Sequence, residues 1–359
     1  MTPTTVRLGT DQRDLEIYRR LFEANGYPRS FEYMRWSCAV RGLPLYGMLS
    51  FDPQREPAAD GLPKATAIYT TLSAPFQLGS ETALVVQSMD TMTDEPYRGR
   101  GLLVLLATGV YDAAARDGVP LVYGFPSKPS RHGMFVSMKW TCLNPVPFLI
   151  RPLRTGYFLR RLVRRERFKA WLPDLPLPRW PRRTVLPGLK IEQIDAFPDD
   201  TDELWHKFSA AIQVGMVRDR AYLDWRYLRK PGAAYRIFAA RRGGSLAGLV
   251  VVRDIDKHGG HIGYLMELLF VPGLRGVAHA LVAHATGDLA RRGCDAVVSW
   301  WFSHSPGYAA FPANGFLPMP EKLRPIELHF GYRAFDPRFE ALLRERRNWH
   351  LSYSDSDTV

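Results

Sequence analysis

A basic, proline-rich connector divides this chain into two halves, and no other feature limits its fold so strongly. Residues 151–190 hold 12 Lys and Arg against 2 Asp and Glu, and five prolines stand in the second part of this segment. Proline removes backbone donors and biases the preceding residue toward extended backbone, so a packed core cannot run through the connector. For a chain of 359 residues this predicts two domains, at 1–150 and 191–345, with a polar tail at 346–359.

The net charge of +12 is concentrated in the connector. Residues 1–150 hold 15 basic against 14 acidic side chains, and residues 191–359 hold 21 against 20. Two nearly neutral domains argue against a protein that coats nucleic acid with its folded surface. Within the connector, residues 151–171 predict an amphipathic basic helix. Such a helix could have a solvated face, lie against an anionic membrane surface, or attract a phosphorylated substrate.

The cysteines and the N-terminus indicate the compartment. Cys38, Cys142 and Cys294 lie far apart, in neither a metal-ligand spacing nor a disulfide set, so we expect no metal and a reducing environment. The N-terminus lacks the basic-then-apolar pattern of an export signal, and the longest apolar runs are too short to span a membrane. We therefore expect a cytoplasmic protein.

Hydrophobic patterning predicts the same order of elements in both halves. Each half begins with helical segments, continues through a strand meander, and ends with a long helix followed by a buried strand. This order predicts an α/β fold with a mixed sheet in each half. The predicted helices cover residues 11–26, 101–118, 201–212, 220–228 and 277–293. The predicted strands include residues 43–51, 64–72, 82–92, 121–125, 262–271 and 295–302.

One junction between a strand and a helix carries the chemistry. The strand at 82–92 leads through a short turn to Arg98-Gly99-Arg100-Gly101, and a helix begins at Leu102. Glycines let backbone N–H groups face a ligand, and the helix start adds a positive dipole end, so this junction predicts a pyrophosphate cradle. Arg98 and Arg100 could add charge-assisted contacts. The spacing matches neither the Walker A pattern nor the dinucleotide pattern.

At these residues the sequence resembles the GNAT superfamily of acyl-CoA-dependent N-acyltransferases, whose pyrophosphate loop reads Gln/Arg-x-x-Gly-x-Gly/Ala. Arg98 and Gly101 match the first two places, and Leu103 departs from the third. The segment 123–140 resembles the family's next strand and helix, with Ser127 where many members have Asn and Phe135 where many carry a catalytic Tyr. The resemblance implies two GNAT-like domains in tandem, each a mixed, mostly antiparallel sheet flanked by helices.

The corresponding loop of the second half keeps Arg275 and Gly276, and we align Ala278 with Gly101. A methyl group there would hinder the approach of a pyrophosphate, so we expect acyl-CoA binding in the first domain only. The tandem arrangement also resembles sugar N-acyltransferases, through QSMDTMTDEPYRGRGL and through RDRAYLDWRYLRKPGAAY at 218–235. This resemblance implies a primary amine acceptor, on an amino sugar or a nucleotide sugar.

The resemblance also implies roles for individual residues, with acetyl-CoA or another acyl-CoA as co-substrate. Backbone N–H groups around Asp90, Thr91 and Met92 are expected oxyanion donors. Asp90 is the first candidate for the base that accepts the amine proton. The alternative is that its carboxylate caps the turn or pairs with Arg98. His132 is the second candidate for this base, and the alternative is that it is an ordinary surface histidine. The residues expected to bind the co-substrate are Met92, Arg98, Gly99, Arg100, Gly101, Leu102, Ser127 and Ser130.

In the second domain, Trp225 and Arg226 offer a stacking surface and an anion contact for a nucleotide. The alternative is that this segment simply packs a helix onto the sheet. Two other functions stay open. One is aminoacyl transfer from tRNA, as in the tandem-GNAT peptidoglycan transferases, which the basic connector favours. The other is a non-catalytic protein that binds a ligand through a degenerate cradle. A homodimer is also left open.

Overall fold

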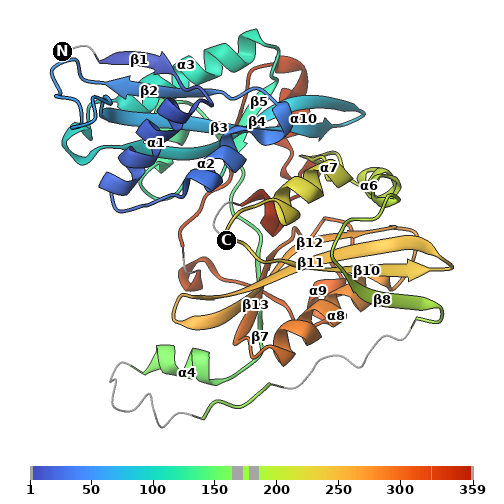
Figure 1. Ribbon diagram of the computed structural model, residues 1–359. Helices are drawn as coiled ribbons and strands as arrows, with labels where there is room; N and C mark the ends of the chain where they lie inside the picture. Colours follow the sequence, from blue (N-terminus) through green and yellow to red (C-terminus); the bar gives the residue numbers. More distant parts are fainter. Residues whose placement is uncertain (1–2, 164–172, 178–185, 325, 357–359) are drawn as a thin grey trace. The chain divides into compact units, whose positions relative to one another are not determined.

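The computed structural model describes residues 3–163, 173–177, 186–324 and 326–356. The chain forms two compact units, each built from separate segments, and both are drawn in Figure 1. Unit 1 comprises residues 1–145, 229–232 and 328–346, and unit 2 comprises residues 146–228, 233–327 and 347–359. The sequence predicted contiguous domains, whereas residues 328–346 pack with the N-terminal half.

The sheet of unit 1 is mixed and mostly antiparallel. Only β4 and β5 pair in parallel among the strands of this order. The strands follow the spatial order β1 (Thr4–Arg7), β2 (Gly47–Phe51), β3 (Ala65–Leu78), β4 (Glu81–Thr93), β5 (Leu121–Gly124), β15 (Gly331–Ala334) and β6 (Thr141–Cys142).

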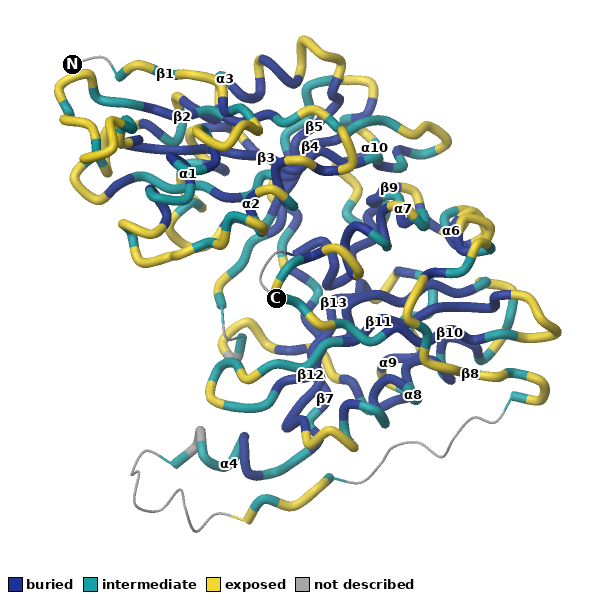
Figure 2. The backbone as a smooth tube through the Cα atoms, in the orientation of Figure 1, coloured by how far each residue is buried: buried dark blue, intermediate teal, exposed yellow. Residues whose placement is uncertain are grey.

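Helices cover both faces of this sheet. α1 (Gln12–Ala24) and α2 (Phe31–Cys38) share one apolar cluster with Ile68, and α3 (Leu102–Arg116) shares another with Tyr69. Successive side chains of a strand point to opposite faces, so these two neighbours mark the two sides of β3. The central strands are accordingly buried (Figure 2).

The sheet of unit 2 repeats this plan, and again one pair of neighbours, β12 and β13, is parallel. α8 (Val277–Arg291) and α6 (Thr201–Ser209) pack on its central strands. The strand order is β14 (Leu317–Pro318), β7 (Phe148–Pro152), β13 (Ala296–Trp300), β12 (Gly260–Phe270), β11 (Ser245–Lys257), β10 (Arg236–Arg242) and β8 (Leu189–Ile194). Among the described residues, the other α-helices and strands are α4 (Gly156–Leu162), β9 (Val214–Met216), α7 (Arg220–Leu223), α9 (Ala310–Ala313) and α10 (Glu340–Arg344).

Two strands join sheets far from their sequence neighbours. β7 overlaps the start of the connector but pairs with β13, and β15 follows the elements of the second half but pairs with β5. The amphipathic helix predicted at 151–171 is therefore wrong at its start, because Arg151 lies in β7 and α4 begins at Gly156. The later arginines of that prediction, at 164, 165 and 167, lie outside the described residues. Within the described ranges, no helix has the length and apolar content needed to cross a membrane.

The C-terminal segment is buried, although we predicted a polar tail at 346–359. Residues 349–356 are each at most 4% exposed. Leu351 and Tyr353 are apolar anchors, and the Tyr353 ring packs 4.8 Å from Trp300 and 5.1 Å from Tyr264, measured between ring centroids. The polar residues next to them are buried because two buried arginines, Arg218 and Arg226, donate hydrogen bonds to this segment, as described below.

Candidate active site

The predicted cradle begins where β4 ends. Asp94 accepts a hydrogen bond from the Glu95 backbone N–H at 3.2 Å and opens a short turn, after which Gly99 and Gly101 both adopt positive φ, +76° and +75°. Glycine adopts this conformation without strain. Gly101 is the N-cap of α3, and no described side chain caps the first N–H groups of the helix. A Cβ atom on either glycine would meet no described atom within 4 Å, so the space over the loop is open.

Arg98 and Arg100 are exposed and fold back onto the loop. Arg98 donates to the Thr93 carbonyl at 3.2 Å and to the Asn25 side-chain oxygen at 3.3 Å. Arg100 donates to the Pro96 carbonyl at 3.0 Å, and its guanidinium lies 4.8 Å from the centroid of the Tyr97 ring. These acceptors are neutral, so both guanidinium charges can still attract an anion at the start of α3.

β4 and β5 part beside this loop. Their parallel pairing runs from Val86 opposite Val122 to Ser88 opposite Gly124, where β5 ends, while β4 continues to Thr93. On its other side β4 carries a register shift: Thr91 lies opposite Tyr69, but Ser88 lies opposite Thr71. A bulge of this kind bends a strand and redirects its backbone groups. The backbone of Met89, Asp90 and Thr91 thus lies beyond the last pair that β4 makes with β5.

Asp90 lies at this bulge and is only 7% exposed. Its carboxylate accepts a hydrogen bond from the Tyr18 hydroxyl at 2.5 Å and another from Arg29 at 3.0 Å. Arg29, rather than Arg98, is the partner. Burial raises the pKa of Tyr18 well above its usual value, so this phenol keeps its proton and remains a donor. Thr91 and Met92 follow on the same strand and are half-buried.

The remaining predicted residues of unit 1 follow β5. Ser127 and His132 are exposed, and the Ser130 hydroxyl donates to the Ser127 carbonyl at 3.2 Å. The helix predicted in this segment is only a π-helical turn at Gly133–Ser137. Within it Phe135 packs against His329, with ring centroids 6.0 Å apart. Leu102 is the buried first residue of α3.

Sequence reasoning missed Tyr18 and Arg29. α2 was not predicted, and Arg29 stands directly before its N-cap, Ser30, whose hydroxyl accepts a hydrogen bond from the Tyr33 backbone N–H. The serine followed by apolar residues at helical spacing was the available signal. Nothing local indicates that Tyr18 and Arg29 meet a carboxylate more than 60 residues away.

The loop of unit 2 shares the glycine N-cap of the loop of unit 1, but a side chain lies against this glycine. Gly276 has φ +85° and is the N-cap of α8, as Gly101 is of α3. Our alignment of Ala278 with Gly101 was therefore wrong, since Ala278 is the second residue of its helix and corresponds to Leu103. Leu186 lies beside this glycine, since a Cβ on Gly276 would be 3.0 Å from its side chain, and we expect it to hinder a ligand at this loop.

Trp225 and Arg226, predicted to hold a nucleotide, are both buried. Arg226 donates to the carbonyls of Ser354 at 3.2 Å and Ser356 at 3.1 Å, and to the Tyr235 hydroxyl at 2.9 Å. Its guanidinium thus fastens the C-terminal segment. This arrangement favours the alternative that these residues pack the helix in the protein interior rather than bind a nucleotide.

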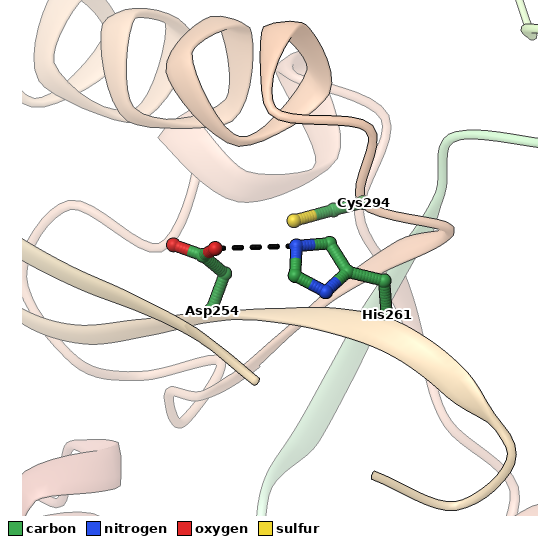
Figure 3. Close-up of side chains that lie close together, drawn as sticks. All are labelled: Asp254, His261 and Cys294. Carbon is green, nitrogen blue, oxygen red and sulfur yellow. Dashed lines mark ion pairs between the residues drawn. The ribbon is translucent and has the colours of Figure 1, made fainter. Parts of the chain in front are cut away.

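Asp254, His261 and Cys294 form a cluster in unit 2 whose ligand-type atoms lie within 4.8 Å of one another (Figure 3). His261 lies 3.2 Å from the Asp254 carboxylate, which also pairs with Arg236 and Arg292. Burial raises the pKa of Cys294 to about 12, so its thiol stays protonated at neutral pH. The Asp254 carboxylate already forms ion pairs with two arginines, and the thiol beside it is protonated. We therefore interpret the three residues as part of an ion-pair cluster rather than a metal centre.

Alkylation distinguishes the three cysteines. Iodoacetamide at pH 8 should modify the exposed Cys142 and leave Cys38 and Cys294 intact until the protein is unfolded. Burial raises the pKa of both buried thiols to about 12, so roughly one in ten thousand is ionised at this pH. Mass spectrometry of peptides from native and guanidinium-treated protein measures the difference. Equal rates at Cys142 and Cys294 in the native protein would contradict the burial.

Comparisons with known proteins agree with this architecture. The sequence profile of the Acetyltransferase (GNAT) family matches residues 200–312, within the second half. No curated protein sequence matches the chain. The structure is similar to N-myristoyltransferase of Saccharomyces cerevisiae with bound myristoyl-CoA, with a TM-score of 0.58 and 12% identity, over 92% of this chain and 82% of that one.

A second similar structure is a conserved protein of Enterococcus faecalis V583, described as a probable N-acyltransferase. The TM-score is 0.59 at 10% identity, over 94% of this chain and 74% of that one. At identities this low, the similarity to both structures shows a shared fold alone. Residues 200–312 thus match the Acetyltransferase (GNAT) family, and the chain as a whole has the fold of two GNAT-like units in tandem.

Proposed function

We propose that this chain is an acyl-CoA-dependent N-acyltransferase whose acyl-CoA binds to unit 1. The observation that carries the proposal is the glycine-capped start of α3. It combines uncapped backbone donors, two exposed arginines with neutral partners, and open space over Gly99 and Gly101. A pyrophosphate suits such a site. The GNAT fold and the myristoyl-CoA bound by the yeast N-myristoyltransferase support acyl-CoA as its carrier.

In the proposed reaction a neutral amine attacks the thioester carbonyl, a C–N bond forms, and the C–S bond breaks to release the thiolate. Backbone N–H groups at the β4 bulge, around Asp90, Thr91 and Met92, would stabilise the oxyanion. Asp90 would accept the amine proton, which finally resides on the thiol. Tyr18 and Arg29 hold its carboxylate in one orientation. Ser127 and Ser130 remain candidates for co-substrate contacts, and His132 for a second base.

We propose acetyl-CoA as the first donor to test and a primary amine as the acceptor. Amino sugars belong in the panel of acceptors to be tested. The hypothesis of a nucleotide sugar depended on contacts from Trp225 and Arg226, and both side chains are buried. The alternative of aminoacyl transfer from tRNA depends on the charge of the connector, most of whose arginines lie outside the described residues. It predicts RNA binding whose affinity falls steeply with salt.

A thiol-release assay tests the proposal. The purified chain is mixed with acetyl-, octanoyl- or myristoyl-CoA and a panel of amines, and free CoA is measured with a thiol reagent. We expect release that requires both an acyl-CoA and an amine, with the acylated amine detected by mass spectrometry. Release that is independent of the amine would indicate hydrolysis, and an absence of release from every donor would leave the non-catalytic alternative.

A further inference from the structure

The two units contain the same arginine–carboxylate pair. Asp90 lies at the register shift of β4 and pairs with Arg29, and Glu267 lies at the register shift of β12 and pairs with Arg218 at 2.7 Å. Each arginine stands directly before the N-cap of a helix, Ser30 for α2 and Asp219 for α7. One local design therefore occurs twice, and the two copies can be compared.

In unit 2 the C-terminal segment of the same chain binds both members of the pair. The Ser352 and Ser354 hydroxyls donate to the Glu267 carboxylate at 3.1 and 3.0 Å, and the Asp355 carboxylate accepts from Arg218 at 2.8 Å. All of these side chains are buried. The C-terminal segment thus presents hydrogen-bond donors to the acid and a carboxylate to the arginine.

In unit 1 no described segment fills the equivalent position. The Arg29 side chain is 33% exposed, and its Nε is buried without a hydrogen-bond partner among the described residues. The guanidinium is fixed over the rings of Phe22 and Tyr33, 5.5 and 5.2 Å from their centroids. Arg29 therefore keeps donor capacity that Arg218 has used.

We propose that the Arg29–Asp90 pair binds the acyl acceptor, and that this acceptor is a small amino acid. Its carboxylate pairs with Arg29, as Asp355 pairs with Arg218, and its amine donates to Asp90, as the serine hydroxyls donate to Glu267. Because Arg29 and Asp90 are 3.0 Å apart, the amine and the carboxylate are separated by one or two carbon atoms. This inference rests on the proposed function and adds its acceptor class.

Matched acceptor pairs test the inference. The full-length chain is assayed for thiol release from acetyl-CoA with glycine, L-alanine and L-phenylalanine, and with the amide of each. The amide loses the carboxylate charge, and its amine has a lower pKa than that of the acid, so kcat/KM is expressed per concentration of neutral amine. We expect kcat/KM to favour the acid by roughly 10- to 100-fold, as for a charge-assisted hydrogen bond. In Arg29→Gln the ratio should fall toward one, whereas Arg35→Gln, which changes an exposed arginine of α2, should keep it.

The outcomes separate the acceptor class from the proposed function. Equal use of acids and amides by the native chain overturns the inference and leaves the function intact. If kcat/KM falls equally for acids and amides in Arg29→Gln, and likewise in Arg29→Lys, the role of Arg29 is purely structural. That result also overturns the inference. If no donor is consumed, calorimetry with glycine and glycinamide alone decides: heat from glycine only, lost in Arg29→Gln, supports the site, and no heat from either overturns it.

Discussion

A Gly101→Glu variant should bind acetyl-CoA at least about 100-fold more weakly than the native chain, which is about 2.7 kcal/mol. Two effects act together. Gly101 has φ +75°, a conformation that costs any other residue roughly 1–2 kcal/mol. The new carboxylate would also stand at the start of α3, where the helix dipole and the two arginines would otherwise attract phosphate. Isothermal titration calorimetry measures the affinity.

Gly118→Glu is the matched control. Gly118 lies just past the other end of α3 and has φ +81°, and a Cβ atom added to it would meet no described atom within 4 Å, as at Gly101. The control adds the same charge and similar backbone strain away from the cradle, so its affinity should stay within a few-fold of native. Native-like affinity in Gly101→Glu would show that acyl-CoA binds elsewhere.

Arg218→Met should lower the free energy of unfolding by about 3–5 kcal/mol. Arg218 is fully buried and pairs with both Glu267 and Asp355. Removing its charge would leave two buried carboxylates beside each other, and burial already raises the pKa of Asp355. Release of the C-terminal segment should relieve part of this cost and expose Tyr353. Chemical denaturation followed by tryptophan fluorescence measures the stability.

Two further variants control for the lost side chain. Arg220→Met removes an arginine only two residues away, whose partner Asp199 is almost fully exposed, and should cost at most about 1 kcal/mol. Adding Glu267→Gln and Asp355→Asn to Arg218→Met should restore part of the stability, since no charge is then left unpaired. If Arg218→Met unfolds as the native chain does, the buried network is not what fastens the C-terminal segment.

Local sequence patterns were sufficient where the physical cause is local. The long helices predicted at 101–118 and 277–293 are observed as α3 and α8. The GNAT-like order of elements in both halves is confirmed by the two sheets and by the similar structures. Periodicity and glycine content carry this information within a few residues.

Long-range pairing could not be predicted in the same way. β15 contributes only four residues, yet it pairs with β5, which is more than 200 residues earlier in the chain. The sequence of the segment at 349–356 suggests a polar tail because its serines and aspartate are polar, and the buried Arg218 and Arg226 that satisfy these polar groups are distant in the chain. Loop alignment failed for a similar reason: Gly276 does repeat Gly101, and the difference lies in Leu186, which is 90 residues upstream.

Calorimetric titration of the intact chain with acetyl-CoA, and with myristoyl-CoA if acetyl-CoA gives no heat, tests the central claim most directly. We predict one binding site per chain, because the cradle of unit 1 is open over Gly99 and Gly101 while Leu186 lies beside Gly276 in the loop of unit 2. Two sites per chain would contradict the expected hindrance at the second loop. No binding of either acyl-CoA would contradict the assignment of the α3 cradle itself.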